Sequence, residues 1–336
     1  MIEDTHVTLA HGNGGRRMRE LIEEIFAHHL GNASLDVQLD AVPLDFAPGM
    51  VPYITTDAFT VRPLEFPGGD IGSLAVNGTV NDLAVSGAEP RFLTLNAIIE
   101  EGLEVECLDR IVRSLADAAR TAGVRVVAGD TKVVPRGQGG GLYFATTGVG
   151  LRAPGHQLGM NRIREGDVLL VSGPAGDHGI AVMLAREEFE LKGSVQSDCA
   201  AVTPLTAPLA AIEGLRFMRD PTRGGVATVA HEIAAATGLN VRLNEAQVPV
   251  RDSVRSFCHM LGYDPYYLAC EGRVVAVAAP DAARDILAIW RGIQAGEHAS
   301  AIGMLSAGKG QVILETEIGG ERFLEELEDD PLPRIC

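Results

Sequence analysis

The sequence predicts an α/β (α+β) protein of two domains followed by a mobile tail, and three observations support this. The chain has 336 residues, and a prior of about 150 residues per domain gives two domains. Strand-like and helix-like segments alternate in two blocks, which the turn-forming stretch Arg152-Ala153-Pro154-Gly155 separates. Residues 325–336 are acidic and hold two prolines, so neither a helix nor a strand continues past Pro331. We therefore expect an N-terminal domain over residues 1–152, a second domain over 153–320 and a flexible tail over 321–336.

In the first block, a strand is expected at 53–56, and a helix follows Gly68-Gly69 with Asp70 as its N-cap. Residues 92–99 form the next β-rich run. Apolar residues then recur at helical spacing from Leu108 to Ala119, and Gly123 stands where a glycine typically ends a helix. Further strands are expected at 124–128 and 142–149, so the block predicts a sheet with helices packed on it.

The second block repeats this alternation. It opens with a strand at 168–171, and a glycine-rich turn leads into a helix from about Asp177. Thr203 is the expected N-cap of a further helix, with proline at the first helical position. The remaining elements are expected as a helix from Val226 to Gly238, a strand at 273–279, a helix at 281–293 and a strand at 312–315.

Composition and charge narrow the functional class. Hydrophobic residues make up 46% of the chain and charged residues 22%, which is ordinary globular composition. The formal net charge is −17, so phosphate backbones are repelled and nucleic acid is not an expected partner. No apolar run approaches the roughly 18 residues of a membrane span, and the first residues show no secretory signal. Five cysteines without a Cys-x-x-Cys pair fit a reducing cytosol, so we expect a cytoplasmic protein.

Acidic residues beside glycine, at expected strand ends and helix starts, are the most informative chemical feature. They occur in Thr55-Thr56-Asp57, in a helix that contains Asn81-Asp82, and in Gly129-Asp130-Thr131-Lys132. Mg²⁺ takes oxygen ligands, usually one or two carboxylates from protein, and binds substrate phosphates. Three such groups beside flexible backbone suit Mg-ATP, although each alone also fits a capping, salt-bridged or turn residue. Standard nucleotide-binding motifs are absent, since neither His11-Gly12-Asn13-Gly14-Gly15-Arg16-Arg17 nor Gly308-Lys309 has the required pattern.

The order of these motifs resembles the ATP-binding superfamily of aminoimidazole ribonucleotide synthetase, selenophosphate synthetase and thiamine-monophosphate kinase. More closely, the chain is similar to the HypE family, the carbamoyl dehydratases of nickel–iron hydrogenase maturation. The resemblance covers essentially the whole chain and implies a two-domain PurM-like fold, like that of aminoimidazole ribonucleotide synthetase. It is carried by the loop His11 to Gly15, Asp57, Asn81-Asp82, Gly129-Asp130-Thr131-Lys132, Asp220-Pro221-Thr222-Arg223-Gly224-Gly225, Cys270-Glu271-Gly272 and Pro333-Arg334-Ile335-Cys336.

The resemblance also implies a reaction. A HypF-type carbamoyltransferase loads a carbamoyl group onto the thiol of Cys336, and ATP-dependent dehydration converts that group to a thiocyanate, giving ADP and phosphate. The cyano group then passes to iron on a HypC–HypD scaffold complex, and the enzyme is a homodimer. Because one thiol has to meet all three sites, we expect the tail from about Glu325 to move, and to dock inward when ATP binds.

The implied site residues fall into three groups. The catalytic residues are Cys336, Glu271 and Lys132, and the Mg²⁺ ligands are Asp57, Asp82 and Asp130. The residues expected to bind ATP and its phosphates are His11, Gly12, Gly14, Gly15, Asp57, Asn81, Thr131, Asp220 and Arg223. Phosphorylation turns a poor leaving group, the carboxamide oxygen, into phosphate, and this step mainly needs positioning and charge neutralisation. Removal of an N–H proton needs a base, for which Glu271 and a buried Lys132 are the candidates.

Several alternatives stay open on the sequence alone. Asp220 and Arg223 could instead order a loop or a domain interface. His11 could be an ordinary loop residue, Glu271 a surface carboxylate and Cys270 a residue packed in the core. A selenophosphate synthetase needs a nucleophilic Cys or selenocysteine in the N-terminal loop, which lacks one, and neither that enzyme nor a thiamine-phosphate kinase needs a thiol at position 336. A nucleotide-gated metal carrier would bind nickel or iron stoichiometrically and hydrolyse ATP weakly, whatever the state of the thiol.

Overall fold

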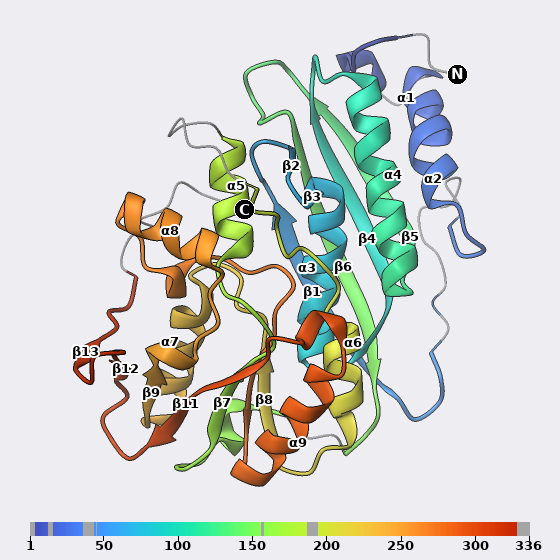
Figure 1. Ribbon diagram of the computed structural model, residues 1–336. Coiled ribbons are helices and arrows are strands. Elements are labelled where there is room, and N and C mark those ends of the chain that lie inside the picture. The colour runs from blue at the N-terminus through green and yellow to red at the C-terminus, as the bar shows by residue number, and fades with distance from the viewer. Residues whose placement is uncertain are drawn as a thin grey trace.

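A computed structural model describes residues 4–12, 16–35, 44, 46–155, 158–186 and 194–327. These residues form two large sheets with helices packed against them and one two-stranded hairpin, and the two large sheet layers adjoin along α3 and α5 (Figure 1). Of the predicted site residues, Gly14, Gly15 and Cys336 lie outside the described ranges. Within these ranges, the helices are all too short or too polar to cross a membrane.

The first sheet has four strands in the order β1-β6-β4-β5. Strands β4 and β5 run parallel, and the other neighbours are antiparallel. Helices α3 and α4 cover one face (Figure 1), while the opposite face carries exposed side chains, including Ile54, which is 75% exposed, and Ile98, which is 38% exposed. The elements are β1 (Val51–Phe59), α3 (Ile71–Val85), β4 (Glu89–Glu100), α4 (Val105–Ala122), β5 (Arg125–Val134) and β6 (Leu142–Arg152), with a small hairpin of β2 (Glu65–Phe66) and β3 (Gly69–Asp70) before α3.

Local sequence signals explain where the two helices of this domain begin and end. The side chain of Asp70 accepts hydrogen bonds from the backbone N–H groups of Gly72 and Ser73, and the Ser73 hydroxyl returns to the backbone of Asp70. This capping box satisfies donors that would otherwise lack partners, which confirms the predicted N-cap. Helix α4 ends at Gly123, whose φ of 72° is the left-handed conformation predicted for that glycine.

The second sheet has seven strands in the order β13-β12-β9-β11-β7-β10-β8, and only the β12–β9 pair is parallel. Helix α7 packs on one face and α9 on the other. The strands are β7 (Val168–Val171), β8 (Leu215–Arg219), β9 (Asn240–Asn244), β10 (Val275–Ala278), β11 (Ser300–Ser306), β12 (Val312–Glu315) and β13 (Glu321–Phe323). The helices are α5 (Asp177–Ala185), α6 (Thr203–Thr206), α7 (Gly225–Thr237), α8 (Asp252–Leu261) and α9 (Pro280–Arg291).

Short helical segments complete the chain. Near the N-terminus these are η1 (Leu9–Gly12), α1 (Arg16–Leu21), the π-helical η2 (Ile22–Ala27) and α2 (His28–Leu30). Single 3₁₀ turns follow at η3 (Met160–Arg162), η4 (Ala207–Ala211), η5 (Glu245–Gln247), η6 (Pro265–Tyr267) and η7 (Gln294–Gly296).

The two domains share buried surface. Ala84 and Val85, at the end of α3, pack in one cluster with Trp290 of α9 and Leu205 of α6. Ile180 of α5 and Phe257 of α8 in turn join the core of the first domain. The last turn of α3 and the loops around it are therefore held between the domains, where catalytic groups can be enclosed.

Some local predictions are wrong. The acidic residues are not at strand ends and helix starts, because Asp57 and Asp130 lie inside β1 and β5, and Asp82 lies in the last turn of α3. Strand β5 continues past Gly129 because Thr131, Lys132 and Val133 pair with Ala97, Ile98 and Ile99 of β4. The N-cap predicted at Thr203 falls on Val202, and Thr203 is the first residue of α6.

The predicted tail begins with ordered structure. Residues 321–323 form the edge strand β13, and the side chain of Leu324 is buried in the core of the second domain. The Nε2 atom of His231 lies 2.9 Å from the carbonyl oxygen of Leu324, and the hydroxyl of Tyr267 donates to the carbonyl of Glu325 at 2.5 Å. An anchored segment therefore extends at least to Glu325, and residues 328–336 lie outside the described ranges.

Candidate active site

Four carboxyl groups from both domains come together where the domains meet. Asp57 comes from β1 and Asp82 from α3, while Asp220 follows β8 and Glu271 precedes β10. The charges of Asp57, Asp82 and Asp220 each raise the pKa of Glu271, and those of Asp57 and Asp82 also raise the pKa of Asp220. The structure thus brings together two of the three predicted metal ligands, and it adds the two acids that the sequence placed in phosphate binding and catalysis.

Among the four carboxyl groups, Asp82 is half-buried and faces the first sheet. The hydroxyl of Thr55 donates a hydrogen bond to Asp82 Oδ2 at 2.8 Å, which links α3 to β1. Burial raises the pKa of Asp82, and the negative charge of Asp57 adds to this, whereas the Thr55 hydrogen bond and the Arg219 guanidinium oppose it. Asp57 itself is exposed and accepts a hydrogen bond from the backbone N–H of Ala58.

Asp220 and Glu271 are buried, with 5% and 3% of their surface exposed. Burial and the negative charge of Asp82 raise the pKa of Asp220 to about 7. Burial also raises the pKa of Glu271 well above its usual value, and Asp220, Asp198, Asp57 and Asp82 add to the effect. A carboxylic acid in such surroundings takes up a proton readily near neutral pH, which is the property of a general base.

The backbone of Glu271 is fixed on both sides. Its N–H donates to Asp198 Oδ1 at 3.0 Å, and its carbonyl accepts from the amide Nδ2 of Asn81 at 3.1 Å and from the N–H of Ala200 at 3.3 Å. Asn81 also accepts from the N–H of Val202 at 2.8 Å. The structure thus makes Asn81 a link between α3 and the Glu271 loop, and a contact between Asn81 and ATP stays a prediction.

Asp130 and Lys132 lie on the other face of the first sheet. Across the sheet, Asp57 pairs with Thr146, Thr146 with Leu95 and Leu95 with Gly129. Three steps of about 4.8 Å place β5 about 14 Å from β1. Thr146 faces α3, since its hydroxyl contacts that of Thr79, and the residue after Gly129 therefore points away from the helices.

On that outer face, Lys132 Nζ pairs with Asp130 Oδ2 at 2.8 Å, and this contact lowers the pKa of Asp130. Lys132 is 66% exposed, so a single copy of the chain does not provide the buried lysine that a lysine base requires. Within one copy, the predicted metal set of Asp57, Asp82 and Asp130 is not assembled.

The N-terminal loop packs on the same strand as Lys132. His11 is buried, and its Nδ1 accepts a hydrogen bond from the backbone N–H of Thr8 at 3.1 Å, so the ring proton sits on Nε2, 3.6 Å from Asp4 Oδ2. A Cβ added to Gly12 would lie 2.7 Å from Cβ of Val133, so this glycine allows the loop to approach β5. Thr131 is buried beside it and donates its N–H to Asp130.

A pocket of about 470 Å³ opens beside Asp82 and Asp220. Its volume falls within the range of small-molecule sites. Both domains line it, with the polar residues Asp82, Arg219 and Asp220 and the apolar or aromatic residues Tyr53, Leu158 and Phe217 among those in its wall. Arg223 is exposed in the loop that precedes α7, three residues after Asp220.

The carboxylates suit a hard divalent cation. Among the residues that the structure describes, no three His, Cys, Asp or Glu side chains stand close enough to hold a metal ion by themselves. Mg²⁺ does not need such a cage, because it is commonly held by one or two carboxylates together with substrate phosphates. Burial is the main cause of the raised pKa values of Asp82 and Asp220, and neighbouring negative charge, which a cation would neutralise, adds to it.

Sequence reasoning missed two residues of this region, Asp198 and Arg273. Asp198 lies in an irregular segment between Ser197 and Cys199, so no periodicity or motif marks it. Arg273 follows the Cys270-Glu271-Gly272 motif directly, and this proximity is the one signal that could have singled it out. Cys270 is buried, and its sulfur accepts from the N–H of Gly176 at 3.3 Å, as expected for a packed core residue.

Comparison with known proteins agrees with this geometry. Residues 38–152 match the N-terminal domain of AIR synthase related proteins, and residues 164–315 match their C-terminal domain. A carbamoyl dehydratase HypE from Azotobacter vinelandii is 44% identical over 98% of this chain and 97% of its own length. A crystal structure of hydrogenase maturation protein HypE in complex with ATP is 42% identical, covers 98% of this chain and 99% of that one, and superposes with a TM-score of 0.93. The crystal structure of a HypE–HypF complex contains a chain that is 43% identical over 91% of this chain and 99% of its own, with a TM-score of 0.80.

The two matched domains and the carboxylates at their junction define an AIR synthase-related protein with the PurM-like fold, as the motifs predicted. Within this class the identity is high over the full length of the relatives. The chain belongs to the HypE family of carbamoyl dehydratases, ATP-using enzymes of hydrogenase maturation.

Proposed function

We propose that this chain dehydrates a carbamoyl group carried on the thiol of Cys336. The carboxamide oxygen attacks the γ-phosphorus of ATP, ADP leaves, and one N–H proton is lost. Removal of the second N–H proton then forms the C≡N bond as the C–O bond to phosphate breaks. The products are a thiocyanate on Cys336, ADP and phosphate, and the thiocyanate supplies the cyanide ligand of the hydrogenase iron.

The observation that carries this proposal is where the C-terminal segment is anchored. Leu327 Cδ1 would lie 3.5 Å from a Cβ on Gly224, which belongs to the loop that begins at Asp220. The four residues from Gly224 back to Asp220 span at most about 14 Å, and nine residues from 328 to 336 reach about 30 Å when extended. A chain of this length from Leu327 is long enough to bring the thiol of Cys336 to Asp220 and to Glu271, whose charges interact.

The roles of the described residues follow from their surroundings. Asp57, Asp82 and Asp220 are the carboxylates that would bind Mg²⁺ together with the ATP phosphates, and the ion would supply the positive charge that phosphoryl transfer needs. Glu271 is the base for the N–H proton, because it is buried and its pKa is raised. His11, Gly12 and Thr131 keep their predicted role in phosphate binding together with Gly14 and Gly15, and Arg223 keeps its predicted role in binding ATP.

A homodimer would complete this site. Ile54, Ile98, Asp130 and Lys132 lie on the face of the first sheet that α3 and α4 leave uncovered. If two copies pack through this face, the partner copy brings an Asp130–Lys132 pair toward the edge of the sheet formed by β1, where Asp57 lies. The predicted contributions of Asp130 to Mg²⁺ and of Lys132 to catalysis then come from across the dimer.

The partners and the compartment are part of the same proposal. The chain in the solved HypE–HypF complex matches nearly its whole length to this one, which supports a HypF-type carbamoyltransferase as the loading partner. A HypC–HypD complex would receive the cyano group. The four cysteines in the described part are free thiols, which fits the cytoplasm.

The test is a comparison of Glu271→Gln with the wild-type protein. Both are incubated with carbamoyl phosphate, ATP and the cognate carbamoyltransferase, and the mass of the intact chain is followed. The variant should accept the carbamoyl group and then accumulate it, because loading is the partner's chemistry. Nitrile formation by the variant at the wild-type rate would remove Glu271 from the mechanism.

A further inference from the structure

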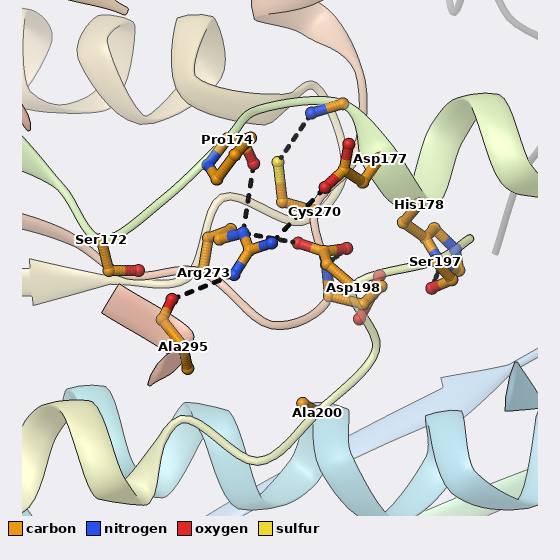
Figure 2. A network of polar contacts seen from close by, with 12 residues as sticks. Ser172, Pro174, Asp177, His178, Ser197, Asp198, Ala200, Cys270, Arg273 and Ala295 are labelled. Atoms are coloured by element: carbon orange, nitrogen blue, oxygen red, sulfur yellow. Dashed lines mark hydrogen bonds and ion pairs between the residues drawn. The ribbon is translucent and has the colours of Figure 1, made fainter. Parts of the chain in front are cut away.

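A buried charged cluster lies directly behind Glu271, in the second domain. Figure 2 shows the Arg273 guanidinium between Asp177 and Asp198, with the carbonyl groups of Pro174 and Ala295 beside it. The side chains of Arg273, Asp177 and Asp198 are 9%, 2% and 1% exposed. Such a cluster costs desolvation energy, and buried ion pairs are weak evidence for stability alone. The cost of burying these charges suggests that the cluster holds a functional segment in place.

The guanidinium is held from several sides. Its Nε donates to the carbonyl of Pro174 at 3.1 Å, and its Nη1 donates to the carbonyl of Ala295 at 3.3 Å. Its Nη2 lies 3.4 Å from Asp177 Oδ2, and its Nε lies 3.3 Å from Asp198 Oδ2. Arg273 is thus a fixed positive charge, held by the turn before α5 and by the segment after α9. Its ion pair with Asp198 orients the Asp198 carboxylate.

The other oxygen of the same carboxylate reaches the proposed base. Asp198 Oδ1 accepts the backbone N–H of Glu271 at 3.0 Å. The two segments are in close contact, since a Cβ on Gly272 would lie only 1.9 Å from the carbonyl oxygen of Asp198. Asp177 makes no such contact, because its other pairing is with Arg251 at 2.9 Å. Both acids therefore pair with Arg273, and Asp198 in addition holds the backbone of Glu271.

We propose that Asp198 and Arg273 are positioning residues of the dehydration step, which hold the backbone of Glu271 so that its carboxyl group meets the carbamoyl nitrogen. This inference rests on the role of Glu271 in the proposed function. Proton transfer requires the base within hydrogen-bond reach of the proton. A displacement of about 1 Å at the reacting groups costs roughly 100-fold in rate, so the backbone anchor of Glu271 governs the rate of the step without touching substrate.

The experiment compares three variants, each with a single substitution in the cluster. Asp198→Ala removes both the partner of Arg273 and the acceptor for Glu271, whereas Asp198→Asn keeps an oxygen acceptor of the same size. Asp177→Ala is the matched control, since it also removes one carboxylate from Arg273 and leaves the Asp198–Glu271 hydrogen bond intact. The carbamoylated proteins are mixed with saturating Mg-ATP, and the single-turnover rate of nitrile formation is measured by mass, with ATP affinity and thermal unfolding in parallel.

Asp198→Ala should lower the rate roughly 100-fold, while carbamoyl loading and ATP affinity change less than about threefold. Asp198→Asn should restore the rate to within about fivefold of the wild type. Asp177→Ala should unfold at a lower temperature but keep the rate to within about threefold. If Asp198→Ala does not fold, Arg273→Gln takes its place. Its rate of nitrile formation should fall about tenfold, because Asp198 is still present but is no longer oriented by the guanidinium.

Two results would overturn the proposal. One is a wild-type rate in Asp198→Ala or, in its place, in Arg273→Gln. The other is an equal loss of rate in Asp177→Ala and Asp198→Ala, which would show that any damage to the charged cluster has the same effect. Glu271→Gln, measured alongside, separates the positioning role of Asp198 from the proposed role of Glu271 as the base. If Glu271→Gln is inactive while Asp198→Ala is unimpaired, the positioning role is excluded and the role of Glu271 stands.

Discussion

Replacing Asp220 by Asn should stabilise the free protein while weakening its hold on Mg-ATP. Asp220 is buried, and burial together with the charges of Asp82 and Asp57 raises its pKa from 3.8 to about 7. Ionisation of this carboxyl is therefore unfavourable in the folded chain, and a neutral amide of the same shape removes that cost. The same carboxylate is proposed to hold the metal and phosphates, so function should fall as stability rises.

The size and the pH dependence follow from the pKa values. As the pH rises from about 4 to 7, the unfolded chain loses the Asp220 proton while the folded chain keeps it, so the wild type loses stability over this interval. A shift of one unit in a pKa corresponds to about 1.36 kcal/mol. The cost of ionising Asp220 in the folded chain therefore reaches about 4 kcal/mol at pH 8 and about 1.5 kcal/mol at pH 5. Asp220→Asn should therefore gain up to these amounts at the two pH values.

Urea unfolding of both proteins at pH 5 and pH 8, with and without Mg-ATP, gives the free energies needed for the comparison. Without nucleotide, the gain of the variant should be larger at pH 8 by about 2.5 kcal/mol. With Mg-ATP, the wild type should recover stability by ligand binding and the variant should recover less. A gain that is equal at the two pH values, or a loss of stability at pH 8 without nucleotide, would refute the reasoning.

Three further substitutions probe other parts of the account. Lys132→Ala should leave thermal stability unchanged, because Lys132 is 66% exposed, yet accumulate the carbamoylated form in the mass assay; unimpaired nitrile formation would exclude the lysine. Gly272→Ala should lower the free energy of unfolding by about 3 kcal/mol or more, measured in urea, since the new Cβ would lie 1.9 Å from the carbonyl oxygen of Asp198; an unchanged midpoint would contradict the close approach. Tyr267→Phe removes the hydrogen bond to Glu325 and should cost about 1 kcal/mol and slow nitrile formation several-fold more than carbamoyl loading; equal effects on both steps would argue against an anchor for the C-terminal segment.

The predictions that succeeded rest on local chemistry. The N-cap at Asp70, the left-handed glycine at Gly123 and the alternation of strands and helices are set by neighbouring residues, and the structure confirms them. The motif order was also sufficient for the family, because it depends on residues that the sequence shows directly. Asp57, Asp82, Asp220 and Glu271 were all selected in this way.

The predictions that failed depend on contacts between distant segments. Strand β5 runs past Gly129 because β4 offers it partners, which the sequence of β5 alone does not reveal. The separation of Lys132 from Glu271 follows from sheet order and from which face each strand turns inward. Asp198 gains its importance from a hydrogen bond to a residue 73 positions away, and no local pattern predicts such a bond.

The central claim is that ATP drives the loss of water from a carbamoyl group on Cys336. The most direct measurement is the intact mass of the chain. The chain is first carbamoylated with carbamoyl phosphate and the cognate carbamoyltransferase, and its mass is then followed with and without ATP in the dehydration step. A thiol that is carbamoylated and then dehydrated gains about 43 Da and afterwards loses about 18 Da. The account predicts that the loss requires ATP, releases ADP and phosphate, and is absent in Cys336→Ser. A carbamoylated chain that keeps its mass while ATP is hydrolysed would contradict it.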